Sequence, residues 1–532
     1  RAKRITSYLN LLHDQTEQKF HQLKSITSTK NPIVKEYLEM LPEYSTLKKE
    51  FTKLVQSKVD FKKVKEWINC NLSKGSIDVN IMTKVDKENY QNKELLPSIY
   101  NDAHAALRGF SNSKLDSSLV LSAGLNPKLY AYISNFDDFY PDVNGYIKKK
   151  IILKVSDYRS AFIQGKFLAK KGIWVSEYRI ESGLNCGGHA FATDGFLLGP
   201  VLKEFKENRA TLKDQIQTIL IEALRNKNRI VPTKDLLLKI TTQGGVGTGS
   251  EHDFLLKEYE LDSVGWGSPF LLVPEATSVD EQTMQKLVQA KESDLYLSNT
   301  SPLGVPFNTL KGNTKDLEKK LNIDKNRPGS SCPSKFVALN KEFKDSGLCI
   351  ASREYQYLKI KELDELAISK KEKLKKYNQI VDKSCICVGL GTSALLVNKA
   401  STLKTGNGVS VCPGPNMAFY SKIASLKNMT DHIYGRDNII SRTDRPNVFI
   451  KELNLYVEYL ENKLDELKIS LDKKQKRYLI KFNRNLQEGI LYYTKLFFKQ
   501  KDTFKATKNT LMETLANKEK QLKYIDLELE KI

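Results

Sequence analysis

The stretch LLLKITTQGGVGTGS, residues 236–250, and the stretch LDSVGWGS, residues 261–268, decide the expected fold. Each joins a short apolar run to a glycine-rich turn, and a helical pattern over 251–259 separates the two. This order of strand, turn and helix is typical of parallel sheets in α/β proteins. Ligand sites in such sheets form at the carboxyl ends of the strands, which is where both turns are placed.

The same alternation extends upstream. Apolar runs rich in β-branched residues alternate with helical patterns over 157–171 and 198–227. Such runs are typical of parallel strands that are covered on both faces. We therefore predict an α/β domain over 76–312, and periodicity alone does not distinguish an open sheet from a closed barrel. The predicted upstream strands are 77–81 (IDVNI), 118–122 (SLVLS), 151–155 (IILKV) and 174–180 (WVSEYRI).

Three other segments have different patterns. Residues 1–75 read as helical, and residues 313–447 read as an irregular region with many Pro and Gly and five cysteines. Residues 448–532 are helical again, and we predict an antiparallel hairpin there or, as the alternative, helices that form a homodimer. The first of these helices carries leucine and valine at heptad spacing, at Leu453, Val457, Leu460, Leu464, Leu467 and Leu471.

Composition excludes several classes of protein. The chain has 532 residues, 40% of them hydrophobic, which is enough for a sizeable core and excludes wholesale disorder. No apolar run is long enough to span a membrane. The net charge is +22, but no nucleic-acid recognition motif accompanies it, so we expect no nucleic-acid partner. Seven cysteines, an odd number, indicate a reducing compartment, and we expect a cytoplasmic protein.

The two glycine-rich turns together predict a phosphate site. Turns after the last two strands of a barrel can hold a phosphate jointly, and glycines beside a helix N-terminus present bare N–H groups to an anion. The spacing matches neither the dinucleotide fingerprint nor the P-loop. The candidate residues are Gly244, Gly245, Gly247, Thr248 and Gly249 from the first turn, and Gly265, Trp266, Gly267 and Ser268 from the second.

A third candidate is the stretch GLNCGGH, residues 183–189, which follows the predicted strand 174–180. Gly187 and Gly188 would let the backbone approach a ligand closely. His189 is then a candidate acid–base or substrate-polarising group. A structural loop histidine is the alternative.

The cysteines of the irregular region leave three interpretations open. Their spacing matches no compact iron–sulfur signature and shows no zinc pair. They are either ligands of an iron–sulfur cluster, ligands of zinc, or buried apolar thiols. The residues concerned are Cys332, Cys349, Cys385, Cys387 and Cys412.

The order of these motifs makes residues 76–312 resemble a known family. The order IDVNIM, SLVLSAGLNP, IILKVSD, CGGH, GGVGTG and GWGS is similar to the FMN-dependent barrel of nitronate monooxygenases (2-nitropropane dioxygenases). It is still more similar to the enoyl reductase component of polyunsaturated-fatty-acid and polyketide synthases, which residues 274–310 also resemble. The resemblance implies strands three to eight of a TIM-type (β/α)8 barrel. The family's first two strands have no counterpart in 1–75, and we expect the sequence to begin inside a longer polypeptide.

The resemblance also implies the site. Asn80 and Lys154 would face the isoalloxazine of FMN, the glycine-rich turns would cradle its phosphate, and His189 would lie where substrate binds. The implied substrate is a small molecule or an acyl-carrier-bound group, with NAD(P)H as a candidate electron donor. The first functional hypothesis is therefore an FMN-dependent oxidoreductase. The alternative is a non-catalytic barrel scaffold or assembly subunit that binds partners through its terminal helices.

Overall fold

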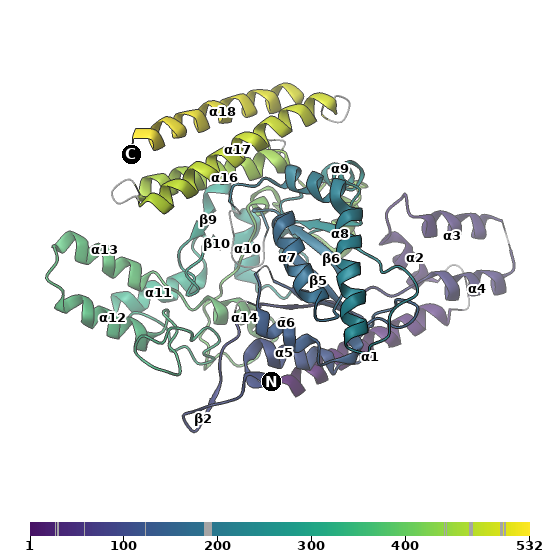
Figure 1. Ribbon diagram of the computed structural model, residues 1–532, viewed down its shortest axis with the longest axis horizontal. Coiled ribbons are helices and arrows are strands. Elements are labelled where there is room, and N and C mark those ends of the chain that lie inside the picture. The colour runs from purple at the N-terminus through teal and green to yellow at the C-terminus, as the bar shows by residue number, and fades with distance from the viewer. Residues whose placement is uncertain are drawn as a thin grey trace.

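The computed structural model describes residues 1–26, 28, 31–57, 59–83, 85–122, 124–185, 194–440, 442, 444–467, 472–500, 504 and 507–531. The N-terminal segment is helical, as predicted, and its helices pack around a small core of their own that includes Val34, Val64 and Ile68 (Figure 1). These helices are α1 (Ala2–Lys24), α2 (Pro32–Glu39), α3 (Thr46–Gln56) and α4 (Phe61–Asn71).

One six-stranded sheet forms the centre of the molecule. Its strand order is β1-β4-β5-β6-β7-β8, and every neighbouring pair is parallel. All six strands predicted from the sequence are confirmed. They are β1 (Val79–Ile81), β4 (Ser117–Leu121), β5 (Lys149–Val155), β6 (Val175–Glu181), β7 (Lys239–Gln243) and β8 (Ser263–Gly265).

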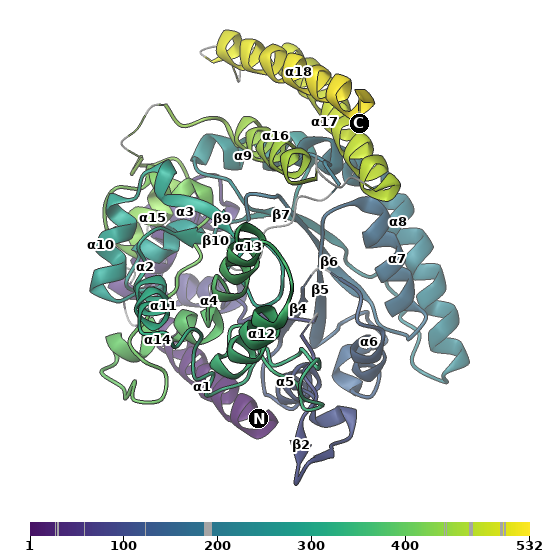
Figure 2. The same ribbon diagram turned by 90° about the vertical axis from the view of Figure 1, so that its left-hand side faces the viewer.

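The two faces of the sheet differ in chemistry. Ile151, Leu153, Tyr178 and Ile180 face the helices that cover the outer side and belong to the main hydrophobic core (Figure 2). Successive strand residues point to opposite faces, so Lys154 and Arg179 face the concave side, together with the apolar Ile152. The connecting helices are α5 (Asp102–Ser111), α6 (Pro127–Ile133), α7 (Tyr158–Ala169), α8 (Leu198–Asn226) and α9 (Gly249–Tyr259).

The complete (β/α)8 barrel implied by the resemblance is not formed. Within the described part of the chain, no strand joins the edge strands β1 and β8, so the sheet is an open, curled half-barrel. The reason is that the segment before β1 forms helices with a separate core instead of two further strands. A second layer packs beside β8 around Leu272, Met417 and Phe419.

The region after β8 contains more regular structure than predicted. The described part of residues 313–447 holds five α-helices, and long stretches without regular structure join them. Its elements and those just before it are α10 (Glu281–Gln289), β9 (Leu295–Ser298), β10 (Phe307–Leu310), α11 (Thr314–Asp324), α12 (Arg353–Glu365), α13 (Lys370–Val381), α14 (Ile386–Val397) and α15 (Leu426–Ile433). Smaller elements of the fold are β2 (Tyr90–Gln91), β3 (Glu94–Leu95), and 3-10 turns at Ser98–Tyr100, Asp137–Phe139, Ser268–Leu272, Glu292–Asp294 and Pro415–Phe419.

Three helices, rather than a two-helix hairpin, close the chain. They are α16 (Val448–Leu467), α17 (Lys473–Lys499) and α18 (Lys508–Lys531), and they lie together along one side of the molecule (Figure 1). Leu453, Val457 and Leu460 of the heptad pattern are fully buried within the chain. The seam therefore packs inside the molecule, whereas homodimer formation stays a prediction.

No single helix in the described ranges is long and apolar enough to cross a membrane, and one bent pair, α13 with α14, meets the criteria of length and composition only.

Candidate cofactor site at the carboxyl edge of the sheet

The two glycine-rich turns meet at one cavity, as predicted. Gly245 and Gly267 both line it, at the carboxyl ends of β7 and β8. The cavity has a volume of about 120 Å³, roughly the share of four liquid waters. It is lined by Leu184, Asn185, Gln243, Gly244, Gly245, Val246, Gly265, Trp266, Gly267, Ser268, Pro269 and Asn416.

The size and lining of this cavity fit a phosphate group but not a whole flavin. Pockets that enclose drug-sized ligands measure about 300–1,000 Å³, which is well above this volume. None of the lining side chains carries a charge, so backbone N–H groups and neutral side chains would hold the anion. The remainder of an FMN molecule would have to lie on the concave face of the sheet.

Gly244 and Gly245 are required by backbone geometry. Their φ angles are +105° and +82°, in a region that side chains rarely adopt. A Cβ at Gly244 would meet the backbone of Asn185 at 2.9 Å, and one at Gly245 would meet Leu184 at 2.5 Å. The glycines thus allow the turn after β7 to approach the segment after β6 closely.

The second half of the first turn has a different role. Gly247, Thr248 and Gly249 do not line the cavity but begin helix α9. The Thr248 hydroxyl accepts the N–H of Glu251 at 3.2 Å, and the Glu251 carboxylate accepts the N–H of Gly247 at 2.9 Å. The anion at this helix N-terminus is therefore the chain's own carboxylate.

A buried ion pair fixes that carboxylate. Arg445, just before α16, donates to the two oxygens of Glu251 at 2.7 and 2.9 Å, and both side chains are almost fully buried. Arg445 also donates to the carbonyl of Gly245 at 2.9 Å. A Cβ at Gly247 would collide with this guanidinium, at 2.5 Å.

The carbonyl of Gly247 is held from the other side. The Tyr420 hydroxyl donates to it at 3.0 Å and His432 Nε2 lies 2.9 Å from it. Burial lowers the pKa of His432, which matches a neutral ring whose Nε2 donates. Asn416 donates to the carbonyl of Gly245. These three residues hold the turn although they lie 171 to 185 positions downstream of it, so the sequence around the turn carries no sign of them.

A polar network covers the concave face beside the cavity. Lys154 of β5 pairs with Glu181 of β6 at 3.1 Å, and Glu181 also accepts from Asn185 and Gln243 at 2.6 and 2.7 Å. Asn80 of β1 is exposed; the register, in which it lies level with Val120 and Ile152, places it on the same face as Lys154. Neither Asn185 nor Gln243 was predicted as a site residue, although Asn185 lies in the candidate stretch 183–189 and Gln243 directly follows an apolar run.

Gly187, Gly188 and His189 lie outside the described residues, so their roles stay predictions. The backbone on either side of this loop is described. Glu452 of α16 accepts the Ser182 hydroxyl at 2.7 Å, the N–H of Gly183 at 3.2 Å and the N–H of Leu198 at 2.7 Å. One fully buried carboxylate therefore ties together the two ends of the segment that carries His189.

Four of the five cysteines singled out in the sequence lie together, and Cys412 lies apart from them. No group of three or more His, Cys, Asp or Glu among the described residues is arranged to hold a metal ion. The Cys332 thiol donates to Cys349 and Cys385, and the Cys387 thiol also donates to Cys385. Cys412 packs in a separate small cluster with Phe307 and Ile386. Cys332, Cys349, Cys385 and Cys387 are free thiols in this structure.

Comparisons with known proteins give little further information. No family model matches the chain, and no curated protein matches it. Among solved structures, the enoyl reductase domain of MlnA from the macrolactin biosynthesis cluster of Bacillus amyloliquefaciens is similar, with 14% sequence identity and a TM-score of 0.35. The match covers 76% of this chain and 88% of that one. A TM-score of this size does not establish a common fold.

Proposed function

We propose that the protein is a flavin-dependent oxidoreductase that holds the phosphate of FMN in the cavity between the two glycine-rich turns. The observation that supports this most directly is the convergence of both turns at the carboxyl ends of β7 and β8. Parallel α/β sheets bind their ligands at this edge. Bound FMN would supply hydride or single-electron transfer.

The chain's own residues would bind and orient the cofactor and exclude water. Gly244, Gly245 and the segment 265–268 would surround the phosphate. Lys154 would offer a cation on the concave face, where its pairing with Glu181 keeps the ammonium group in place. His189 remains the proposed acid–base group at the substrate, which would be a small molecule or an acyl-carrier-bound group.

The test is a comparison of FMN with riboflavin, which lacks the phosphate. Purified protein should bind FMN at least about tenfold more tightly, equivalent to about 1.4 kcal/mol. Asn416→Asp places an isosteric carboxylate on the cavity wall and should remove most of that preference, because two anions repel. Fluorescence titration with both flavins measures the ratio of their dissociation constants. This ratio does not change if a variant merely contains less folded protein.

Asn378→Asp is the matched control, since Asn378 is exposed on α13 away from the cavity. It should leave the ratio unchanged. Protein that takes up neither flavin would refute the proposal and favour the non-catalytic scaffold. A preference for FMN that survives Asn416→Asp would place the phosphate elsewhere.

A further inference from the structure

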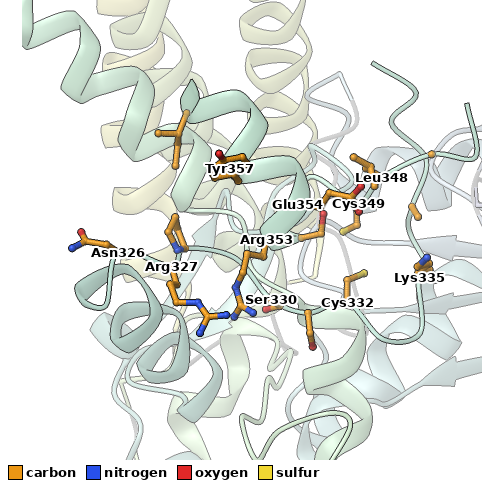
Figure 3. Close-up of a pocket in the computed structure, with 16 residues that line it drawn as sticks. Asn326, Arg327, Ser330, Cys332, Lys335, Leu348, Cys349, Arg353, Glu354 and Tyr357 are labelled. Atoms are coloured by element: carbon orange, nitrogen blue, oxygen red, sulfur yellow. The ribbon is translucent and has the colours of Figure 1, made fainter. Parts of the chain in front are cut away.

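A larger cavity lies away from the sheet edge, in the region of the cysteines. Its volume is about 690 Å³, within the range of sites for small organic ligands. It is formed by the loop before α12 and by the first turns of that helix (Figure 3). Apolar side chains such as Leu348, Tyr357 and Ile360 make up part of its wall.

The cavity is electropositive. Arg327, Lys335 and Arg353 line it, and within the described ranges none of the three forms an ion pair. The Nε of Arg353 is buried and has no hydrogen-bond partner among those residues. The only lining carboxylate, that of Glu354, is 3.4 Å from Lys344. Three cationic side chains beside a single carboxylate that is already paired favour an anionic ligand.

Two free thiols share the cavity with these cations. Cys332 and Cys349 both line it, and they belong to one buried cluster with Ala338 and Ala351. In Figure 3 the side chains of Arg327 and Arg353 turn toward one end of the cavity, and the two cysteines lie toward the other. An anion bound by the arginines would therefore bring its remaining atoms toward the thiols.

The surroundings of Cys349 favour the thiolate. The hydrogen bond from the Cys332 thiol, and after it the backbone N–H groups of Ala351 and Ser352 at the start of α12, lower the pKa of Cys349. The hydrogen bonds that the Cys332 thiol makes to Cys349 and to Cys385 raise the pKa of Cys332. The thiolate is the reactive form of cysteine, and a helix N-terminus favours it.

We propose that this cavity binds a low-molecular-weight anionic disulfide, with which Cys349 and Cys332 exchange. The inference is independent of the flavin proposal, because it concerns a separate cavity. The unpaired arginines recognise the ligand's negative charges, and the apolar wall contacts its chain. Cys349 is the nucleophile and Cys332 the resolving thiol.

The exchange balances in two steps. The Cys349 sulfur attacks one sulfur of the ligand, the ligand's S–S bond breaks, and the first thiol leaves with the proton that Cys349 gave up. The Cys332 sulfur then attacks the Cys349 sulfur, and the second thiol leaves with the proton of Cys332. The ligand is reduced by two electrons to two thiols, and the two cysteines are oxidised to one disulfide.

The experiment compares two probes on the full chain. Oxidised glutathione is an anionic disulfide and cystamine is a cationic one. After reaction, unreacted thiols are alkylated and peptide mass spectrometry reads each cysteine separately. We expect a Cys332–Cys349 disulfide in the wild type and a mixed disulfide trapped on Cys349 in Cys332→Ser. The rate with oxidised glutathione should exceed that with cystamine by about tenfold or more, through electrostatic attraction.

Charge variants test the recognition. The double variant Arg327→Gln with Arg353→Gln should bring the two rates close together, whereas Lys361→Gln, exposed on the same helix and not lining the cavity, should leave their ratio unchanged. Circular dichroism checks the fold of each variant. Equal rates for both probes in the wild type, modification confined to the exposed Cys70, or stoichiometric iron or zinc on Cys332 and Cys349 would each overturn the proposal.

Discussion

The carboxyl edge of the sheet and the cavity beside α12 both contain a buried arginine group, and the two are used differently. Arg445 donates to both oxygens of Glu251, so the chain neutralises its own charge there. The Nε atoms of both arginines are buried without a hydrogen-bond partner among the described residues, so the difference lies at the ends of the two guanidinium groups. The end of Arg353 contacts only the carbonyl of Gly329 among those residues, at 3.4 Å, and no carboxylate. The first arginine builds the structure, whereas the positive charge of the second is not neutralised by the described part of the chain.

The surroundings of Arg445 also show that a glycine-rich turn before a helix does not by itself indicate a ligand site. The turn 244–249 looks like an anion-binding loop before a helix. The N–H of Gly247 is nevertheless occupied by the Glu251 carboxylate, and only the first part of the turn lines a cavity. The rest of it joins the sheet to the segment that precedes α16.

We expect the largest effect from a variant that breaks the ion pair between Arg445 and Glu251. Arg445→Ala leaves the Glu251 carboxylate buried and unpaired, which should destabilise the fold by about 3–5 kcal/mol. Urea unfolding measures the loss. Adding Glu251→Ala to Arg445→Ala removes the unpaired charge and should recover part of the stability.

The matched control is the exposed pair Arg484 and Glu488, 3.3 Å apart with side chains 78% and 65% exposed. Removing Arg484 should cost no more than about 1 kcal/mol. If Arg445→Ala lowers the free energy of unfolding by no more than this, the ion pair between Arg445 and Glu251 does not stabilise the fold.

The second prediction concerns how protein stability depends on pH through the buried carboxyl group of Glu452. Burial raises the pKa of this carboxyl above its ordinary value of 4.5. The folded state then binds the proton more tightly than the unfolded chain does, so wild-type stability falls as the pH rises from about 4.5 through the folded-state pKa. The side chain of the Glu452→Gln variant does not titrate, but it has one acceptor oxygen where glutamate has two, so a hydrogen bond is lost. At pH 4–5 this variant should be about 1–3 kcal/mol less stable than the wild type.

That deficit should shrink as the pH rises, and denaturant unfolding at several pH values follows it. A deficit that stays constant with pH would mean that Glu452 is not the group whose protonation is linked to folding. A deficit that grows would mean that its pKa is lowered by the donors of Ser182, Gly183 and Leu198.

The sequence predicts the sheet better than the site. Alternating apolar runs mark each strand, because strand burial is a local pattern, and all six were found. Asn416, Arg445 and Glu452 complete the carboxyl edge from more than 150 residues away, and their identity leaves no local signal. The arginines of the second cavity differ in this respect, because Arg327 and Arg353 are close in sequence to Cys332 and Cys349. What the sequence does not show is that the two halves of this segment face one cavity.

The smallest expected effect compares two glycines of α14, two residues apart. A Cβ at Gly391 would meet nothing within 4 Å, whereas one at Gly389 would meet the Ser410 hydroxyl at 2.5 Å and its backbone N at 3.0 Å. Neither has a positive φ angle, so conformation does not separate them. Gly391→Ala should stabilise the protein by about 0.5–1 kcal/mol, because alanine restricts the unfolded chain and favours the helix. Gly389→Ala should destabilise it, by about 1–3 kcal/mol, through overpacking. Thermal unfolding of both variants measures the two signs. Opposite signs would show that a glycine in the thiol region, like Gly247 at the sheet edge, is required where another part of the chain packs against it, whereas equal effects would leave the packing of α14 against Ser410 without energetic consequence.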